Sequence, residues 1–164
     1  MSQIYDKAAS YLSRGNRSEK EVRDYLKKQG FSDAEVGPAI AELQSFGYID
    51  DAAYSKLYAR YGAQKGWGMD RIYRQLAGKG ISREVVEEAL SQMEEEGESL
   101  GADRQRAMAM AQKILAGACL QPGEEVSQKL KARVARRLSG YGYSSQIIYD
   151  ILGRLGQEEA PDEG

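Results

Sequence analysis

The sequence contains no histidine and a single cysteine, Cys119. Histidine is the commonest general base and a common metal ligand, so its absence removes the usual route to acid–base catalysis and to a histidine-based metal site. One cysteine forms no disulfide within the chain, and without a histidine partner it does not fit a thiol enzyme. We therefore expect a reducing, cytoplasmic compartment, with Cys119 as a small apolar filler.

The chain also lacks long apolar runs and nucleotide-binding motifs. No run approaches the roughly 20 residues that a membrane helix needs, and the N-terminus has no basic-then-apolar signal pattern. Gly62, Gly66 and Gly68 do not fit the glycine-rich loops that cradle phosphates. Lysine, tyrosine or carboxylate catalysis stays open, but nothing singles out such a set. We expect no enzyme, no cofactor, no metal and no membrane association.

A repeated motif is present instead. Segments 26–32, 76–82 and 138–144 each read Leu, three residues, Gly, a bulky apolar residue, then Ser. Glycine permits a left-handed helix C-cap, and the serine can cap the next helix. Further apolar residues lie four positions before each Leu and four, eight and eleven positions after each Ser. Residues at these spacings share one helix face. Across the three copies these residues are Val22, Ile72 and Val134 before the motif, and Val36, Ile40, Leu43, Val86, Leu90, Met93, Ile148, Leu152 and Leu155 after it.

This pattern predicts an all-α protein made of three tandem three-helix repeats. The expected boundaries are 1–48, 49–98 and 99–156, followed by an acidic tail over 157–164 that we expect to be disordered. A unit of roughly 45 residues is marginal alone, so neighbouring units should supply buried surface to each other.

Several helix ends can be predicted in detail. Ser18 and Glu21 have the spacing of a capping box, as do Ser32 and Glu35. Pro38 should kink its helix or delay the start of that helix. Asp103 should cap a long helix that runs to about residue 115, and the next helix should run over 124–139.

Two features of the second predicted unit have competing interpretations. Asp50 and Asp51 could be acid–base groups or metal ligands, but a helix cap with favourable charge at an N-terminus is the simpler interpretation. Residues 65–68, Lys-Gly-Trp-Gly, should form a flexible joint that bears the only tryptophan.

The net charge of −2 conceals basic clusters. Acidic residues occupy 84–98 and the tail, and the helices after the first two glycine turns carry acidic residues, which argues against a DNA-reading helix-turn-helix. Basic residues lie on the helices before the turn, where they suit contact with a phosphate backbone or an acidic protein groove, unless they are ordinary solvated faces. The candidate binding residues are Arg60, Lys65, Trp67, Arg71, Arg74, Lys79, Lys129, Arg133, Arg136 and Arg137.

Two tyrosines lie beside the third glycine turn. Both could stack on nucleic-acid bases. Tyr143 matches Phe31 and Ile81 in the repeat, so we expect a core position for it. The pattern leaves the role of Tyr141 undecided.

Several motifs, in fixed order, resemble the RecX family of recombinase regulators over residues 8–155. The first includes Tyr11-Leu12, Arg17-Ser18-Glu19, Glu21-Val22, Leu26, Gly30-Phe31, Leu43, Gly47-Tyr48-Ile49-Asp50-Asp51 and Tyr54. The second includes Arg60, Lys65-Gly66, Gly68, Ile72, Leu76 and Lys79-Gly80-Ile81, and the third includes Arg136-Arg137-Leu138 and Gly142-Tyr143.

The resemblance implies three tandem three-helix units in an elongated, curved molecule without catalytic activity. It implies a DNA repair and recombination regulator that lodges in the groove of RecA filaments on single-stranded DNA, where it restrains ATP hydrolysis and strand exchange. Some family members also bind DNA directly. We expect a monomer, and a modular chain with basic faces could contact successive RecA subunits through several weak contacts. A stand-alone single-stranded DNA binder and an adaptor for another protein are the alternatives.

Overall fold

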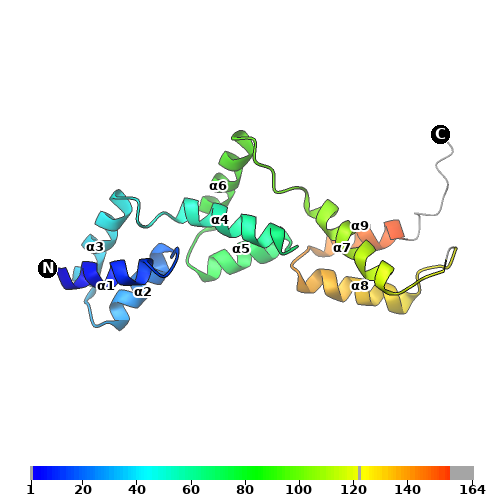
Figure 1. Cartoon of the computed structure of the whole chain (residues 1–164), viewed down its shortest axis with the longest axis horizontal. Helices are drawn as coiled ribbons and strands as arrows, with labels where there is room; N and C mark the ends of the chain where they lie inside the picture. The colour runs from blue at the N-terminus through cyan, green and yellow to red at the C-terminus, as the bar shows by residue number, and fades with distance from the viewer. Residues whose placement is uncertain (1, 122, 156–164) are drawn as a thin grey trace. The chain divides into compact units, whose positions relative to one another are not determined.

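The computed structural model describes residues 2–121 and 123–155, and this part of the chain forms nine α-helices and no strand (Figure 1). The prediction of an all-α protein is therefore confirmed. The helices are α1 (Ser2–Leu12), α2 (Glu19–Lys28), α3 (Asp33–Ser45), α4 (Asp51–Gln64), α5 (Met69–Gly78), α6 (Arg83–Glu95), α7 (Asp103–Gly117), α8 (Gln128–Gly140) and α9 (Ser145–Leu155). The predicted acidic tail lies outside the described residues. Within those residues, every helix is too short or too polar to cross a membrane.

The chain contacts group into two compact units. The first unit contains residues 1–59 and 73–99, and the second contains residues 60–72 and 100–164. Each unit takes residues from more than one predicted repeat, because the divisions fall inside α4 and α5. The repeat boundaries predicted from the sequence stay a prediction.

The core of the first unit is built from the predicted apolar stripes. The side chains of α2 and α3 that recur at helical spacing are fully or almost fully buried. Tyr11 and Tyr25 stack beside this core, with ring centroids 4.1 Å apart. The buried cluster consists of Ala8, Val22, Leu26, Val36, Ile40, Leu43 and Ile49.

The core of the second unit combines small and large side chains. Ala107 and Ala111 are fully buried on α7, and they face a cluster that includes Val134, Leu138, Tyr143, Ile151 and Leu155. The core position predicted for Tyr143 is confirmed, because this residue is only 4% exposed. Its hydroxyl donates a hydrogen bond to the Gly66 carbonyl at 2.5 Å, which satisfies the one polar atom of the side chain.

In each unit, the start of one helix is hydrogen-bonded to the end of another helix. In the first unit, the N-cap Ser18 hydroxyl donates to the Lys79 carbonyl at the end of α5, at 2.7 Å. In the second unit, the Gly68 N–H before α5 donates to the carbonyl of Tyr141, the C-cap of α8, at 2.8 Å. A helix N-terminus carries partial positive charge and a C-terminus partial negative charge, so these contacts also pair opposite dipole ends.

An aspartate completes each junction. Asp51 accepts a hydrogen bond from the Glu19 N–H at 2.9 Å, and Asp103 accepts one from the Met69 N–H at 3.0 Å. Each aspartate is the first residue of its own helix, and each accepts from the first residue of the middle helix one repeat earlier. The free N–H groups at the start of α2 and α5 therefore bond to a distant aspartate.

Most predicted helix caps are confirmed. Both capping boxes form, at Ser18–Glu21 and Ser32–Glu35. Asp50 accepts from the Ala53 N–H at 3.0 Å and thus caps α4, as the simpler interpretation of the paired aspartates predicts. In the described part of the chain, no cluster of three or more Cys, Asp or Glu side chains could hold a metal ion.

Three local predictions are wrong, and one alternative of a fourth is excluded. The delayed start at Pro38 does not occur, because α3 begins at Asp33 and runs through the proline, whereas the kink stays a prediction. Asp103 does not cap its own helix: α7 follows Ala102 without a side-chain cap, since the Asp103 carboxylate is directed to Met69 and Arg106. The helix predicted over 124–139 begins at Gln128, where Ser127 caps it. Cys119 is exposed at a positive φ of 54° and is not an apolar filler.

The segment predicted as a flexible joint, residues 65–68, is tied to its surroundings by backbone hydrogen bonds. The Trp67 N–H donates to the Gly62 carbonyl at 2.9 Å, and Gly66 and Gly68 make the bonds to Tyr143 and Tyr141 described above. Gly68 has no room for a side chain, because an added Cβ would lie 2.5 Å from the Gly142 carbonyl oxygen. The glycine is needed here for close backbone approach.

Candidate functional site

The two units differ in the sign of their charge. Residues 60–72 and 100–155 of the second unit carry twelve Lys and Arg against five Asp and Glu, whereas residues 1–59 and 73–99 of the first unit carry eleven against sixteen. A partner with negative charge is therefore attracted to the second unit. The sequence predicted the basic segments. Which of these segments share a unit depends on the fold, because α4 and α5 are each divided between the two units.

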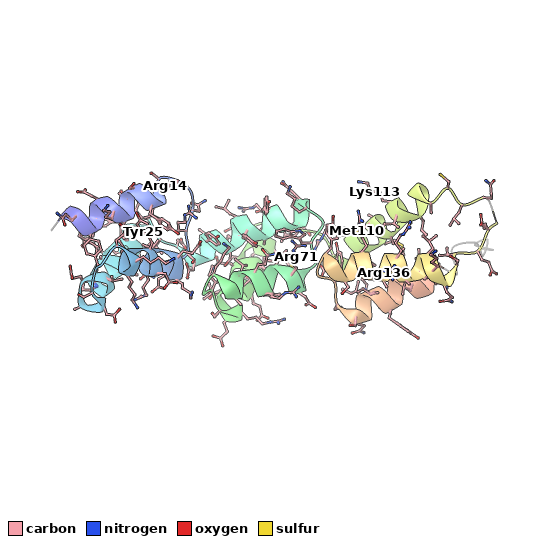
Figure 2. The ribbon with its side chains drawn as sticks, turned by 90° about the horizontal axis from the view of Figure 1, so that it is seen from below. Arg14, Tyr25, Arg71, Met110, Lys113 and Arg136 are labelled. Atoms are coloured by element: carbon pink, nitrogen blue, oxygen red, sulfur yellow. The ribbon has the colours of Figure 1, made fainter. Side chains whose placement is uncertain are left out.

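A groove in the second unit concentrates this charge. It has a volume of about 520 Å³, and its walls come from the end of α4 with the turn after it, and from α7 and α8. No acidic side chain from the part of the chain that the structure describes lines it. Its cationic residues are Lys65, Arg106, Lys113 and Arg137, and its apolar residues include Met110, Ile114 and Tyr141. We call this set the basic groove; Figure 2 labels Met110 and Lys113 on α7.

Three of the four cations in the basic groove are available to a ligand. The Arg106 guanidinium is held inside the unit, because it donates to Asp103 and to the Leu100 and Gly101 carbonyls at 2.7 and 2.9 Å. Lys65, Lys113 and Arg137 are exposed, and none of them pairs with an acidic side chain among the described residues. The Lys65 ammonium lies 5.5 Å from the Tyr61 ring centroid.

A second basic surface lies on α8. Lys129, Arg133, Arg136 and Arg137 are all exposed and make no ion pair with a described residue. We call these four residues the α8 basic face; Arg136 is labelled in Figure 2. Arg137 belongs to both surfaces, so the α8 basic face continues into the basic groove.

Two of the predicted binding residues make contacts inside the second unit. The Arg71 guanidinium lies 4.1 Å from the Trp67 ring centroid and donates to the Gly140 carbonyl at 3.1 Å. Trp67 also packs edge-on against Tyr61, with centroids 5.5 Å apart. This stack supports the junction between α5 and α8, so it positions the walls of the basic groove.

The other predicted residues differ in exposure. Arg74 is exposed and Arg60 is half-buried. The Lys79 ammonium lies 3.8 Å from Glu21 and within 6 Å of the Tyr54 and Tyr58 ring centroids. Burial acts to lower the pKa of Lys79, but its hydrogen bond and charge interaction with Tyr54 outweigh burial and raise that pKa. Lys79 thus remains charged inside its own network in the first unit.

Sequence reasoning missed two residues of the basic groove, Arg106 and Lys113. Lys113 is an isolated basic residue in an Ala/Met-rich helix, and Arg106 has one basic neighbour, Arg104, offset by Asp103, so no strong local charge cluster marks either residue. The position of Tyr141, undecided from the sequence, is now clear: its half-buried side chain lines the basic groove. The groove can therefore offer cations to anionic oxygens and a ring face to a planar or apolar group.

Comparison with known proteins gives a consistent result. Residues 5–43 match the first three-helix domain of RecX, and residues 50–90 match the second three-helix domain of RecX. The chain belongs to the RecX family. These two RecX domains cover the helices α1–α3 and α4–α6, in agreement with tandem three-helix repeats.

The similarity to RecX relatives extends through the whole chain. It is 31% identical over 161 residues to the regulatory protein RecX of Bacillus licheniformis, which covers 98% of this chain and 57% of that protein. It is 30% identical over 145 residues to the regulatory protein RecX of Clostridium botulinum, covering 88% of this chain and 65% of that protein. The chain thus spans between about half and two thirds of the length of these relatives.

A solved structure supports the fold. The crystal structure of RecX from Lactobacillus salivarius superposes with a TM-score of 0.75 at 24% identity, and the match covers 94% of this chain and 95% of the other. At this level of identity the comparison shows that the two RecX chains share a helical fold.

Proposed function

We propose that this chain is a regulator of the RecA recombinase. It binds RecA filaments on single-stranded DNA in the cytoplasm and mainly inhibits their ATP hydrolysis and strand exchange. It acts by binding and performs no reaction of its own. Membership of the RecX family supports the regulatory role, and the joined basic surfaces of the second unit are the observation that supports a contact with an anionic nucleoprotein polymer.

The proposed contact involves the α8 basic face and the three available cations of the basic groove. Arg60 and Arg74 are further contact candidates, whereas Trp67, Arg71 and Lys79 contribute through the internal contacts described above. Several weak contacts along a repeating polymer add up to tight binding, because each later contact forms at high effective concentration.

A charge-reversal experiment tests the proposal. A variant with Glu at Lys129, Arg133, Arg136 and Arg137 should lose inhibition of RecA ATPase and strand exchange. The matched control replaces four exposed basic residues elsewhere, Lys7, Arg14, Lys28 and Arg154, with Glu. Both variants should keep wild-type helical content by circular dichroism. Full inhibition by the α8 variant would show that this face is not the contact.

The second candidate is a single-stranded DNA binder that needs no recombinase. The half-buried Tyr141 beside three available cations favours it, because bases stack on aromatic rings while lysine and arginine contact phosphates. Engaging about five phosphates gives a log–log salt slope near −3.5 for single strands. One salt series that compares naked DNA with RecA-coated DNA separates the two functions: the first requires much tighter binding to the coated strand.

A further inference from the structure

We propose that the acidic segment 156–164 of this chain docks in cis into the basic groove and competes there with the anionic partner. The docking contact concerns the chain alone, whereas its regulatory consequence rests on the proposed function. The argument has three parts: the charge of the groove, the charge of the segment and the distance that the segment must span.

Among the described residues, the basic groove has four cations and no acidic residue in its lining, and of those four cations Arg106 alone pairs with a described acidic neighbour, Asp103. Lys65, Lys113 and Arg137 therefore repel one another across about 520 Å³ of open volume. Like charges gathered in one concave site raise its affinity for anions.

The segment has the complementary charge. Residues 156–164 contain Glu158, Glu159, Asp162 and Glu163 and no basic residue. The segment thus has four carboxylates, and the basic groove has three available cations. Because the segment is covalently attached, its local concentration at the groove is on the order of millimolar, far above that of a free acidic peptide in the cell.

The segment is also long enough. α9 begins four residues after Tyr141, which lines the basic groove, and it packs against α7 and α8, which form two of the groove's walls. Its 11 residues extend about 16 Å at 1.5 Å per residue. Nine extended residues span about 30 Å at roughly 3.3–3.6 Å each. The segment can therefore return along α9 to the groove.

Paramagnetic relaxation measures this contact directly. In a Cys119→Ser background, a spin label is attached at Ala160→Cys in the full chain, and broadening is followed at the amides of Gly66, Lys113 and Tyr141. We expect strong broadening at about 50 mM salt that disappears near 0.5 M salt, because salt screens exposed charges. The control is a neutral-segment variant with the same label, in which the chain also carries Glu158→Gln, Glu159→Gln, Asp162→Asn and Glu163→Gln. This variant should give little broadening.

Three outcomes would overturn the docking contact. These are no broadening at the groove amides, equal broadening with the neutral segment, and broadening that appears only between separate copies when labelled and isotopically enriched chains are mixed. The last result would assign the groove to the segment of a second copy.

The regulatory consequence has its own readout. The neutral-segment variant should bind RecA-coated single-stranded DNA roughly three- to tenfold more tightly than the wild type at low salt, and the difference should vanish at high salt. Broadening together with unchanged filament affinity would overturn the competition while leaving the docking contact in place. Absence of any filament binding by either chain would instead contradict the proposed function.

Discussion

Asp103 accepts a hydrogen bond from the backbone N–H of Met69 at 3.0 Å, although 34 residues separate the two in sequence. Asp51 makes the same contact with Glu19 across 32 residues, at 2.9 Å. In both cases the first helix of one repeat supplies an acceptor to the middle helix of the repeat before it. The two aspartates thus connect consecutive repeats through hydrogen bonds.

Removing the Asp103 acceptor should destabilise the second unit. Asp103→Ala leaves the Met69 N–H without its acceptor, and it removes the carboxylate that pairs with Arg106. It should therefore lower the free energy of unfolding by about 1–2 kcal/mol. Asp103→Asn keeps an acceptor oxygen and should lose less. Asp70→Ala, at an exposed position in the first turn of α5, serves as the control. Urea denaturation of the three variants measures these differences in the free energy of unfolding. Equal losses of stability for Asp70→Ala and Asp103→Ala would contradict the prediction.

Two glycines with similar backbone conformation should respond differently to alanine. Gly30 has φ of 98° and open space around it, whereas a Cβ on Gly142, with φ of 94°, would lie 2.1 Å from the Arg71 Cβ. Gly30→Ala should therefore cost about 1 kcal/mol from the left-handed conformation alone. Gly142→Ala adds a steric clash at the junction of α5 and α8 and should cost at least twice as much. Thermal melting compares the two variants directly. Similar melting temperatures would show that the junction of α5 and α8 accommodates the added methyl group without a loss of stability.

Asp51 should make stability depend on pH. Burial, opposed by the hydrogen bond from Glu19, raises the pKa of Asp51 above its usual value of 3.8. An acid with a raised pKa binds its proton more tightly in the folded state, so its ionised form lowers stability above that pKa. Asp51→Asn keeps an acceptor without the charge. It should therefore be at least as stable as the wild type at pH 7.

The advantage of Asp51→Asn should shrink as the pH falls through the raised pKa toward pH 3.8, where the wild-type carboxyl becomes protonated in both states. Unfolding in urea at pH 7 and pH 4 measures this change. Asp50→Asn, which removes one charge from the same helix end, is the control. If the stability advantage of Asp51→Asn over the wild type grew between pH 7 and pH 4, the prediction would be contradicted.

Lys113 should contribute to binding although no charge cluster marks it in the sequence. Lys113→Glu places an acid among the other cations of the basic groove, and it should weaken binding to RecA-coated single-stranded DNA by roughly three- to tenfold at low salt. Lys7→Glu changes the same charge at an exposed position of the first unit and should have little effect. Fluorescence anisotropy across a salt series measures both. Identical affinities for the two variants would remove the basic groove from the binding surface.

Local sequence patterns are enough to predict most of the helices and much of the core. The motif Leu-x-x-x-Gly-apolar-Ser specifies where α2, α5 and α8 end and where the following helices begin, because a glycine C-cap and a serine N-cap act within a few residues. The apolar spacing likewise identified Val22, Leu26, Val134 and Leu138 as buried. Both signals are local, so a linear chain is enough to predict them.

Contacts between groups that are distant in the sequence depend on how the helices pack. The partners of Asp51 and Asp103 lie more than 30 residues away, and the basic groove brings together Lys65 from the turn after α4, Lys113 from α7 and Arg137 from α8. Charge acts through space, and its effect depends on which helices pack together in each unit. A pattern of neighbours along the chain contains no such distances, which is why Lys113 was missed and why Asp103 was assigned to the wrong helix.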